Sequence, residues 1–270
     1  MKKTRSFWMI TYVVFLLAAI IVLFQWYTDQ NSKRMEERNK NYAADSAQIK
    51  AEQINDELGN ALSRISAYSY FTGTSLDKPE VTPQMLKEME ENTQFDAVIF
   101  TDLNGIDYAS DGRTVEVMDR DFYKKGIEGD EGISIIYDPR FFDETMACFY
   151  TPVRYNGEII GVLRGAYLAE EYLKNMLSTT YFGEAADVYL CAADGKVIAG
   201  SDNTTIYEEP LLEILQKNGV IDEQAAADAK AVFENGGEGA FICEENSEVD
   251  NLCVTYLPGR DYVMVQLFPP

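Results

Sequence analysis

The sequence predicts an α+β fold in which one long N-terminal helix is followed by two small modules, each an antiparallel sheet flanked by helices. Three observations lead to this prediction. Residues 28–71 contain no proline and a single glycine, Gly59, as a long helix requires. Strand-turn-strand patterns with Asn-Gly or Asp-Gly turns are typical of antiparallel hairpins. One such pattern recurs 90 residues along the chain, which indicates a repeated module.

Charge and composition exclude several function classes. The 270 residues include 23 basic and 45 acidic side chains, for a formal net charge of −22. Residues 1–40 carry +4 and the remainder −26, so we expect no nucleic-acid partner. The chain has no histidine and four scattered cysteines without a CxxC motif. The commonest general base and the commonest zinc ligand are therefore missing, and we expect neither a metal nor another cofactor.

A membrane span is predicted at residues 7–27, which contain no charged side chain. As a helix, 21 residues cover about 31 Å at about 1.5 Å per residue, enough to cross a bilayer. Trp8 and Trp26 lie near its two ends, as in aromatic belts. A cleaved signal peptide would have a shorter apolar run. The basic side chains of Lys2, Lys3 and Arg5 predict a cytoplasmic N-terminus, with residues 28–270 outside the cytoplasm in a cell-membrane protein.

The juxtamembrane helix, residues 28–71, carries an apolar seam. Its members recur every three or four positions, as in a heptad repeat: Ala47, Ala51, Ile54, Leu58, Ala61, Ile65 and Tyr68. The seam has two interpretations, packing on the chain's own modules or pairing with a second chain, and both can hold along different turns. We expect a homodimer in the membrane.

The first module, residues 72–181, is predicted to lie farther from the membrane, and we call it the distal module. In order, the pattern predicts a helix at 83–92, a hairpin at 95–110, a helix at 120–128 and strands at 132–137, 145–154 and 158–167. Consecutive hairpins indicate an antiparallel sheet, with helices on one side, in place of a parallel βαβ arrangement.

The second module, residues 182–268, repeats this plan, and we call it the proximal module because it is predicted to lie nearer the membrane. Its hairpin at 186–201 aligns with the first so that Gly105 falls on Gly195 and Ala109 on Ala199. Helices at 208–218 and 222–235 and strands near 238–244, 251–257 and 261–268 complete the prediction.

Three short motifs carry a family resemblance. They are Arg120-Asp121-Phe122-Tyr123 at a helix start, Tyr150-Thr151-Pro152 in a strand, and Gly157 to Leu163 in the next strand. With the single span and long helix, the chain resembles the double Cache (PAS-like) sensor regions of bacterial transmembrane receptors. The resemblance implies a ligand in the distal module and a cytoplasmic output absent from this chain, a diguanylate cyclase first and a histidine kinase or chemoreceptor next.

The candidate ligand-binding residues lie around the helix start at position 120. Arg120 offers a forked donor for a carboxylate, Phe122 an aromatic face and Tyr123 a phenol. The resemblance implies further contacts at Tyr137 and Asp138. The alternatives are that Phe122 and Tyr123 are core residues, that Arg120 pairs with a neighbouring acid, and that positions 137 and 138 are a strand end and a turn.

One departure from the family bears on the ligand. Relatives that recognise amino acids or amines place an acid on the strand where this chain has Ala166. Arg164 is two residues earlier and shares its strand face. Two guanidiniums, from Arg120 and Arg164, would favour a small acid such as a dicarboxylate. Alternatively, Arg164 lies at a solvated edge.

Other function classes have weaker support in the sequence. A membrane-anchored structural or adhesion module is the first alternative, and an exported carboxylate-based hydrolase is the second. No glycine-rich phosphate loop or GxSxG motif is present, so we expect no catalysis by this chain. Cys148 and Cys191 are expected in buried strands, and a disulfide between Cys243 and Cys253 is left open.

Overall fold

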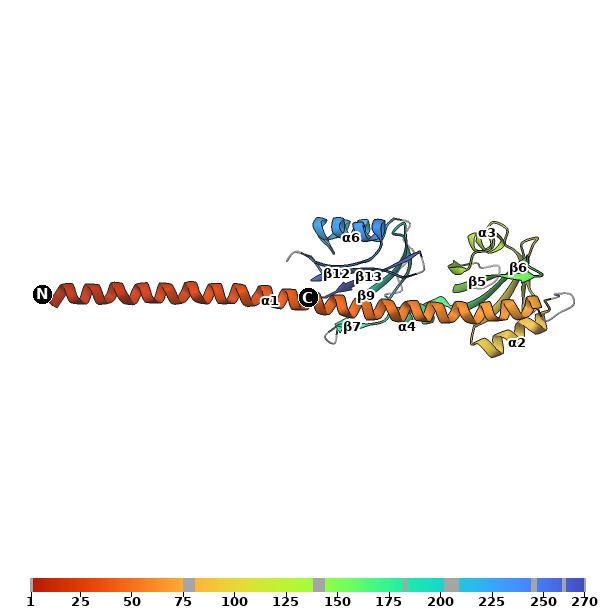
Figure 1. Ribbon diagram of the computed structural model, residues 1–270, viewed down its shortest axis with the longest axis horizontal. Helices are drawn as coiled ribbons and strands as arrows, with labels where there is room; N and C mark the ends of the chain where they lie inside the picture. Colours follow the sequence, from red (N-terminus) through yellow and green to blue (C-terminus); the bar gives the residue numbers. More distant parts are fainter. Residues whose placement is uncertain are drawn as a thin grey trace.

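A single continuous helix, α1 (Lys2–Thr74), runs alongside two separate sheets and extends well beyond them at its N-terminal end (Figure 1). At about 1.5 Å per residue, its 73 residues span about 110 Å. The computed structural model describes residues 2–74, 81–137, 144–181, 184–201, 209–243, 247–258 and 261–269. For residues 2–14, 71, 74, 136, 137, 181 and 184 it describes the backbone alone.

The distal module is built on a six-stranded antiparallel sheet with strand order β3-β2-β1-β6-β5-β4. Asn104 and Gly105 form the turn between its first two strands, and Gly105 has the positive φ of 71° that such a turn needs. The elements are α2 (Pro83–Thr93), β1 (Ala97–Asp102), β2 (Ile106–Ala109), β3 (Thr114–Glu116), α3 (Asp121–Glu128), β4 (Gly132–Tyr137), β5 (Thr145–Tyr155) and β6 (Glu158–Leu168).

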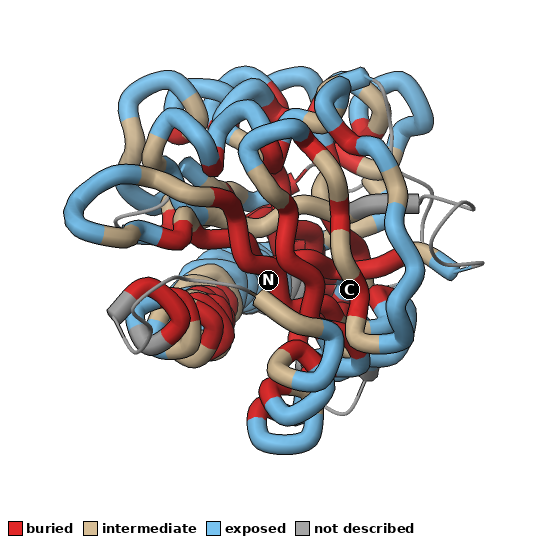
Figure 2. The backbone as a smooth tube through the Cα atoms, turned by 90° about the vertical axis from the view of Figure 1, so that its right-hand side faces the viewer, coloured by how far each residue is buried: buried red, intermediate tan, exposed pale blue. Residues whose placement is uncertain are grey.

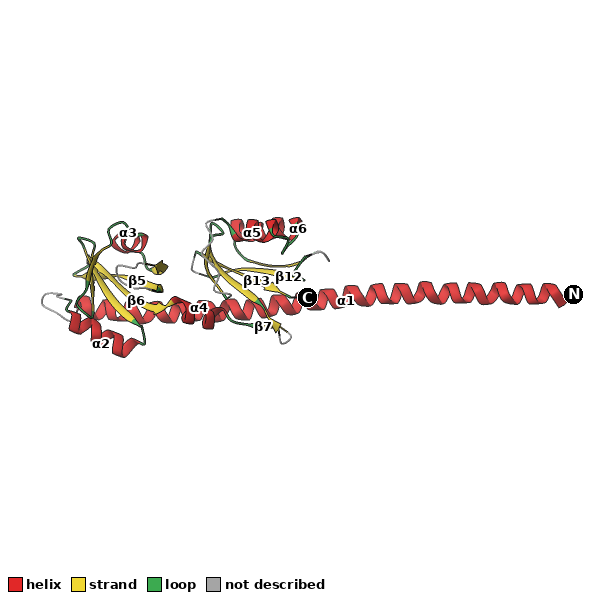
Figure 3. Cartoon of the chain, turned by 180° about the vertical axis from the view of Figure 1, so that it is seen from behind, coloured by secondary structure: helices red, strands yellow, loops and turns green. Residues whose placement is uncertain are grey.

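The expectation that helices cover one side of this sheet is wrong. Figures 1 and 3 show α1 and α2 on one face and α3 on the other. The core is divided accordingly, since Phe100 and Phe149 pack with α1 whereas Tyr150 and Val162 pack with α3. Alternate residues of a strand point to opposite faces, and both faces of these strands are apolar, so each needs a cover.

Among the described residues, the proximal module repeats the strand order of β2, β1, β6, β5 and β4. Its five-stranded sheet has the order β10-β9-β13-β12-β11, which matches β2-β1-β6-β5-β4. The predicted fold class is thus confirmed. The elements are β7 (Thr180–Tyr181), β8 (Glu184–Ala185), β9 (Asp187–Ala192), β10 (Val197–Gly200), α5 (Leu211–Lys217), α6 (Glu223–Asn235), β11 (Glu238–Ile242), β12 (Asn251–Tyr256) and β13 (Tyr262–Phe268).

The apolar seam of α1 packs on the chain's own modules. Ala47, Ile54, Leu58 and Ile65 are each at most 1% exposed. Figure 2, which looks along the molecule, shows buried positions gathered on the strands and on one side of the helix. Of the two interpretations of the seam, the structure therefore shows the intramolecular one.

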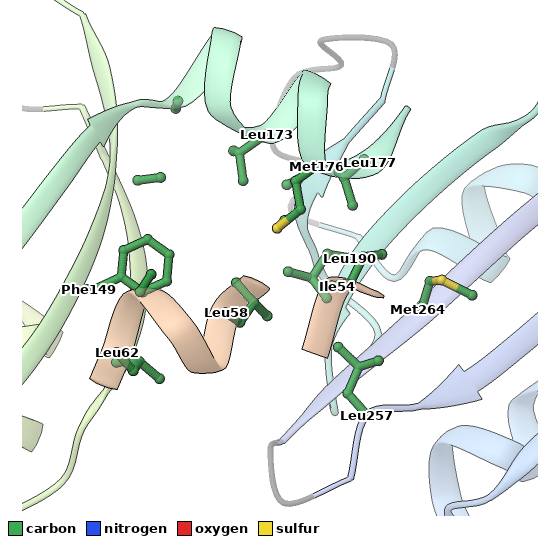
Figure 4. Close-up of a cluster of buried hydrophobic side chains, with 14 of the residues drawn as sticks. Ile54, Leu58, Leu62, Phe149, Leu173, Met176, Leu177, Leu190, Leu257 and Met264 are labelled. Carbon is green, nitrogen blue, oxygen red and sulfur yellow. The ribbon is translucent and has the colours of Figure 1, made fainter. Parts of the chain in front are cut away.

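A helix that the sequence patterns did not indicate, α4 (Ala169–Leu177), joins the two modules. Figure 4 shows its side chains Leu173 and Met176 pointing toward Ile54 and Leu58 of α1, with Leu190 of the proximal sheet beside them. At the C-terminal end of α4, the ammonium group of Lys50 donates a hydrogen bond to the carbonyl oxygen of Ser178 at 2.7 Å. One continuous core thus connects both modules to the long helix.

The N-terminal span and the cysteines complete the comparison with the sequence. Among the residues whose side chains are described, no helical stretch is long and apolar enough to cross a bilayer. Part of the predicted span 7–27 lies outside that set. All four cysteines are free and buried. Cys253 belongs to the core facing α1 and Cys243 to the core facing α5 and α6, so the disulfide left open by the sequence is not formed.

Candidate functional site

Helix α3 lies close against the distal sheet because a glycine faces the strand beneath it. A Cβ atom at Gly126 would stand 2.6 Å from Cγ2 of Val162, which is far inside van der Waals contact. Phe122 and Tyr123 come from the same buried side of the helix and are 2% and 3% exposed. The first turn of α3 is therefore fixed over the sheet, with its polar side chains at the rim.

A pocket of about 250 Å³ opens beside this first turn, between α3, β4 and β5 of the distal module and β10 of the proximal module. Its lining residues are Asp121, Phe122, Lys125, Ile133, Ser134, Ile135, Tyr150, Val197 and Ile198. The size suits a small organic molecule. In this wall, β4 of the distal module and β10 of the proximal module are about 60 residues apart in the sequence.

Opposite charges from one helix turn stand at the mouth of the pocket. Asp121 and Lys125 are four residues apart, which places them on one helix face, and both are exposed. Ile133 and Ile135 supply the apolar wall. The pocket can thus offer a carboxylate, an ammonium group and an apolar surface to one bound molecule.

Tyr150 places a phenol in the same wall. Burial raises its pKa to about 12, and the nearby acids Asp130 and Asp121 add to the shift. It is therefore a neutral hydrogen-bonding group at physiological pH. Its hydroxyl oxygen would lie 2.9 Å from a Cβ at Gly132, so the glycine leaves the space that this hydroxyl occupies.

Behind the pocket, Phe122 covers a buried ion pair. Cζ of Arg164 lies 4.0 Å from the centroid of the Phe122 ring. The guanidinium of Arg164 is paired with the carboxylate of Asp107, and their side chains are 5% and 2% exposed. Asp107 also accepts a hydrogen bond of 2.5 Å from the Thr101 hydroxyl. The positive charge of Arg164 is thus balanced within the protein.

The predicted site residues divide into three groups. Phe122 lines the pocket, and Arg164 lies against the Phe122 ring without lining the pocket itself. Arg120 is the residue before α3, with Nε 3.9 Å from Oδ2 of Asp119, and the Tyr123 hydroxyl donates to the Leu103 carbonyl at 2.9 Å. Neither is among the pocket-lining residues. The Tyr137 side chain and all of Asp138 lie outside the described residues.

Sequence reasoning missed the partner of Arg164 and much of the pocket. Asp107 shares a strand face with Ala109, two residues later, and both are buried. That alternation was a usable signal that Asp107 is buried and needs an oppositely charged partner. Ala166 is fully buried and joins the apolar cluster with Ile99 and Cys148. Within the described part of the chain, no group of histidine, cysteine or acidic side chains could hold a metal ion.

Comparisons with known proteins identify the fold. No family model matches the sequence, and no curated protein matches it either. Solved structures do match. The ligand-binding domain of the Pseudomonas fluorescens chemoreceptor CtaA, in complex with L-isoleucine, gives a TM-score of 0.65 at 17% identity, over 90% of this chain and 96% of that one.

This chain shares the fold of that ligand-binding domain. The ligand-binding domain of the Pseudomonas aeruginosa amino-acid chemoreceptor PctC, in complex with GABA, gives a TM-score of 0.61 at 16% identity, over 85% of this chain and 99% of that one. The ligand-binding domain of the Campylobacter jejuni chemoreceptor Tlp3, in complex with L-norvaline, gives a TM-score of 0.61 at 15% identity, over 87% of this chain and 92% of that one. The double Cache resemblance predicted from the sequence is confirmed at the level of the fold.

Proposed function

We propose that this chain is the extracytoplasmic ligand-sensing region of a bacterial transmembrane receptor and that it binds without catalysis. The observation that carries the proposal is the pocket beside α3, with Asp121 and Lys125 at its mouth and Ile133 and Ile135 in its wall. These groups suit recognition of a small molecule through charge and apolar contact. Cys148, on the distal-module strand β5 that also carries Tyr150, is buried. Burial raises the pKa of its thiol to about 11, which suits a core residue and not a nucleophile.

The ligand we propose carries both a carboxylate and an amino group. Lys125 would pair with the carboxylate and Asp121 with the amino group, since opposite charges favour a zwitterion over a simple anion. Because Asp107 already balances Arg164, we assign Arg164 to support Phe122 and leave Arg120 as the second candidate for the carboxylate. The fold neighbours in complex with GABA, L-isoleucine and L-norvaline give independent support for this class.

Signalling would pass through both modules. Val197 and Ile198 of β10 form part of the pocket wall, so a ligand there would touch the proximal as well as the distal module. The Tyr262 hydroxyl adds a direct link, since it accepts a hydrogen bond of 3.2 Å from the Ile133 amide. We propose that residues 7–27 cross the membrane and that α1 carries the signal to a cytoplasmic output outside this chain, a diguanylate cyclase first and a histidine kinase or chemoreceptor next.

A binding experiment on the full chain in lipid nanodiscs tests the proposal. The probes are L-isoleucine, L-norvaline and GABA, with butyrate, n-butylamine and succinate as probes that carry only one kind of charge. A ligand at about 100 times its Kd should stabilise the protein by about 2.7 kcal/mol, which thermal unfolding resolves. We expect stabilisation by an amino acid and little by the single-charge probes.

Matched variants locate the site. Lys125→Gln and Asp121→Asn should each weaken the best ligand about tenfold. Lys87→Gln is the control, because Lys87 is exposed on α2 and does not line the pocket. Arg120→Gln tests the second candidate. If succinate binds best and Arg120→Gln alone abolishes it, the ligand class is wrong. If no probe binds, or Lys87→Gln weakens binding as much as Lys125→Gln, the site is wrong.

A further inference from the structure

The pocket beside α3 lies along the edge of a sheet. Among the described strands, β4 is the last of the distal sheet and pairs on one side only, with β5. An edge strand presents backbone N–H and C=O groups that have no partner in the sheet. Ile133, Ser134 and Ile135 of β4 line the pocket, and each is partly buried. The wall of the pocket therefore includes main-chain groups as well as side chains.

Tyr262 of the proximal module shows which backbone groups of β4 point outward. Its hydroxyl accepts a hydrogen bond of 3.2 Å from the Ile133 amide and donates one of 3.4 Å to the Ile133 carbonyl. Both groups of Ile133 thus point away from β5. Backbone directions alternate from residue to residue in an antiparallel pair, so the N–H and C=O groups of Ile135 also point outward.

The outward groups of Ile135 lack the partner that Ile133 has. Its register partner in β5, Ala147, is on the other side of the strand. Within the described part of the chain, no residue forms a hydrogen bond with the outward N–H or C=O group of Ile135. A ligand that displaced water from this edge without replacing its hydrogen bonds would leave two main-chain groups unpaired, which costs free energy.

A single amino acid has too few polar groups for this pocket. In the binding mode proposed above, its carboxylate pairs with Lys125 and its ammonium group with Asp121, so no acceptor remains for the N–H of Ile135. A dipeptide has the same two charged ends and, between them, an amide carbonyl that can accept from that N–H. Asp121 and Lys125 are about one helix turn apart, with about 5–6 Å between their Cβ atoms, a separation that favours charged ends held apart by a peptide bond.

We propose that the ligand of this pocket is a short peptide, which binds as a strand added to the edge of β4. This inference rests on the proposed function and names its ligand class. The Ile135 N–H donates to the peptide carbonyl, and the terminal ammonium group donates to the Ile135 carbonyl and to Asp121. Lys125 binds the terminal carboxylate. Val197 and Ile198 line the pocket from β10 and contact the peptide side chains, since an added strand is selected through such side-chain contacts.

Two matched pairs of probes test the peptide class on the full chain in lipid nanodiscs. Glycylglycine and 5-aminopentanoate have the same charged ends and the same chain length, but the second has no amide. L-isoleucylglycine and L-isoleucine share a side chain, but the second has no peptide bond. Isothermal titration measures all four. In each pair we expect the peptide to bind at least about tenfold more tightly.

A backbone variant tests the contact with β4. Ile135→Pro removes the N–H group, and proline is tolerated on an edge strand where that group points outward. It should abolish the preference for glycylglycine and leave the affinity for 5-aminopentanoate unchanged. Ile135→Val keeps the N–H group, so it is the matched control and should retain the preference. Thermal unfolding checks that both variants fold, and the comparison of probes on the unmodified chain is decisive without them.

The possible outcomes separate this inference from the proposed function. If 5-aminopentanoate binds as tightly as glycylglycine, or a folded Ile135→Pro chain keeps the preference, the peptide class is wrong. The ligand site itself then stands, provided that Lys125→Gln weakens both probes. If Lys125→Gln weakens neither probe, or if no probe binds, the pocket is not the ligand site, and the peptide inference is overturned with it.

Discussion

The Arg164 guanidinium stacks on the Phe122 ring, with 4.0 Å between Cζ and the ring centroid. This contact joins strand β6 to the first turn of α3, beneath the residues that line the pocket. It holds because Asp107 balances the buried charge from a neighbouring part of the sheet. An arginine that the sequence offered as a ligand contact thus supports the pocket from behind.

The Arg164–Asp107 pair should be strongly coupled. Asp107→Ala leaves a buried guanidinium without its counter-charge and should lower the free energy of unfolding by about 3–5 kcal/mol. The double variant Asp107→Leu with Arg164→Met removes both charges and should recover most of that loss. Chemical unfolding of the full chain and both variants measures the effect. Additive losses in the double variant would contradict the coupling.

The approach of α3 to β6 should depend on Gly126. Gly126→Ala places a methyl group against the Val162 side chain and should cost about 1–3 kcal/mol through overpacking. Adding Val162→Ala returns the space, so the pair should be more stable than the sum of the single changes predicts. Thermal unfolding checks this, and a Gly126→Ala chain as stable as wild type would show that α3 shifts freely.

Gln266 should be a site where a less polar residue stabilises the protein. It is fully buried, and neither amide atom has a hydrogen-bond partner among the described residues. Because an unsatisfied buried polar group is costly, Gln266→Met should raise the free energy of unfolding by about 1 kcal/mol or more. Gln216→Met, on the exposed side of α5, is the control and should stay within about 0.5 kcal/mol of wild type. A destabilised Gln266→Met chain would mean that the amide is hydrogen-bonded after all.

Stability should fall at high pH partly through Tyr150. Burial raises its folded-state pKa from 10.0 to about 12, so between these values the folded protein holds a proton that the unfolded chain releases. The stabilisation is fully present below pH 10 and is lost as the pH rises toward 12, by up to about 3 kcal/mol. Tyr150→Phe should reduce this loss in unfolding experiments from pH 9 to 11.5. An identical pH profile in the variant would refute the assignment.

The cysteines should behave as reduced core residues. Burial raises the pKa of Cys243 and Cys253 to about 12, so their reactive thiolate forms are scarce at neutral pH. A maleimide should label none of the four cysteines at an appreciable rate before unfolding, and a reducing agent should leave the melting temperature unchanged. A drop in melting temperature on reduction would reveal a disulfide.

Local patterns were sufficient for most of the elements and for the fold class. The hairpin turns at Gly105 and Gly195, the proline-free helix and the 90-residue repeat each reflect interactions between residues close in the chain. Turn geometry and side-chain periodicity follow from backbone sterics and burial on one face. For this reason the repeated module and the apolar seam of α1 could be anticipated without a structure. Helix α4 was missed because its short apolar face gave no extended periodicity.

Only the tertiary structure decided what those surfaces contact. The seam of α1 could pack on its own modules or on a second chain, and the apolar faces of both sheets determined the outcome by covering it. Arg164 could be a ligand contact or an edge residue until the sheet brought Asp107 beside it. The pocket wall joins Ile133 to Ile198, residues from different modules. Such long-range pairs depend on packing and charge neutralisation in three dimensions, which no local pattern in the sequence records.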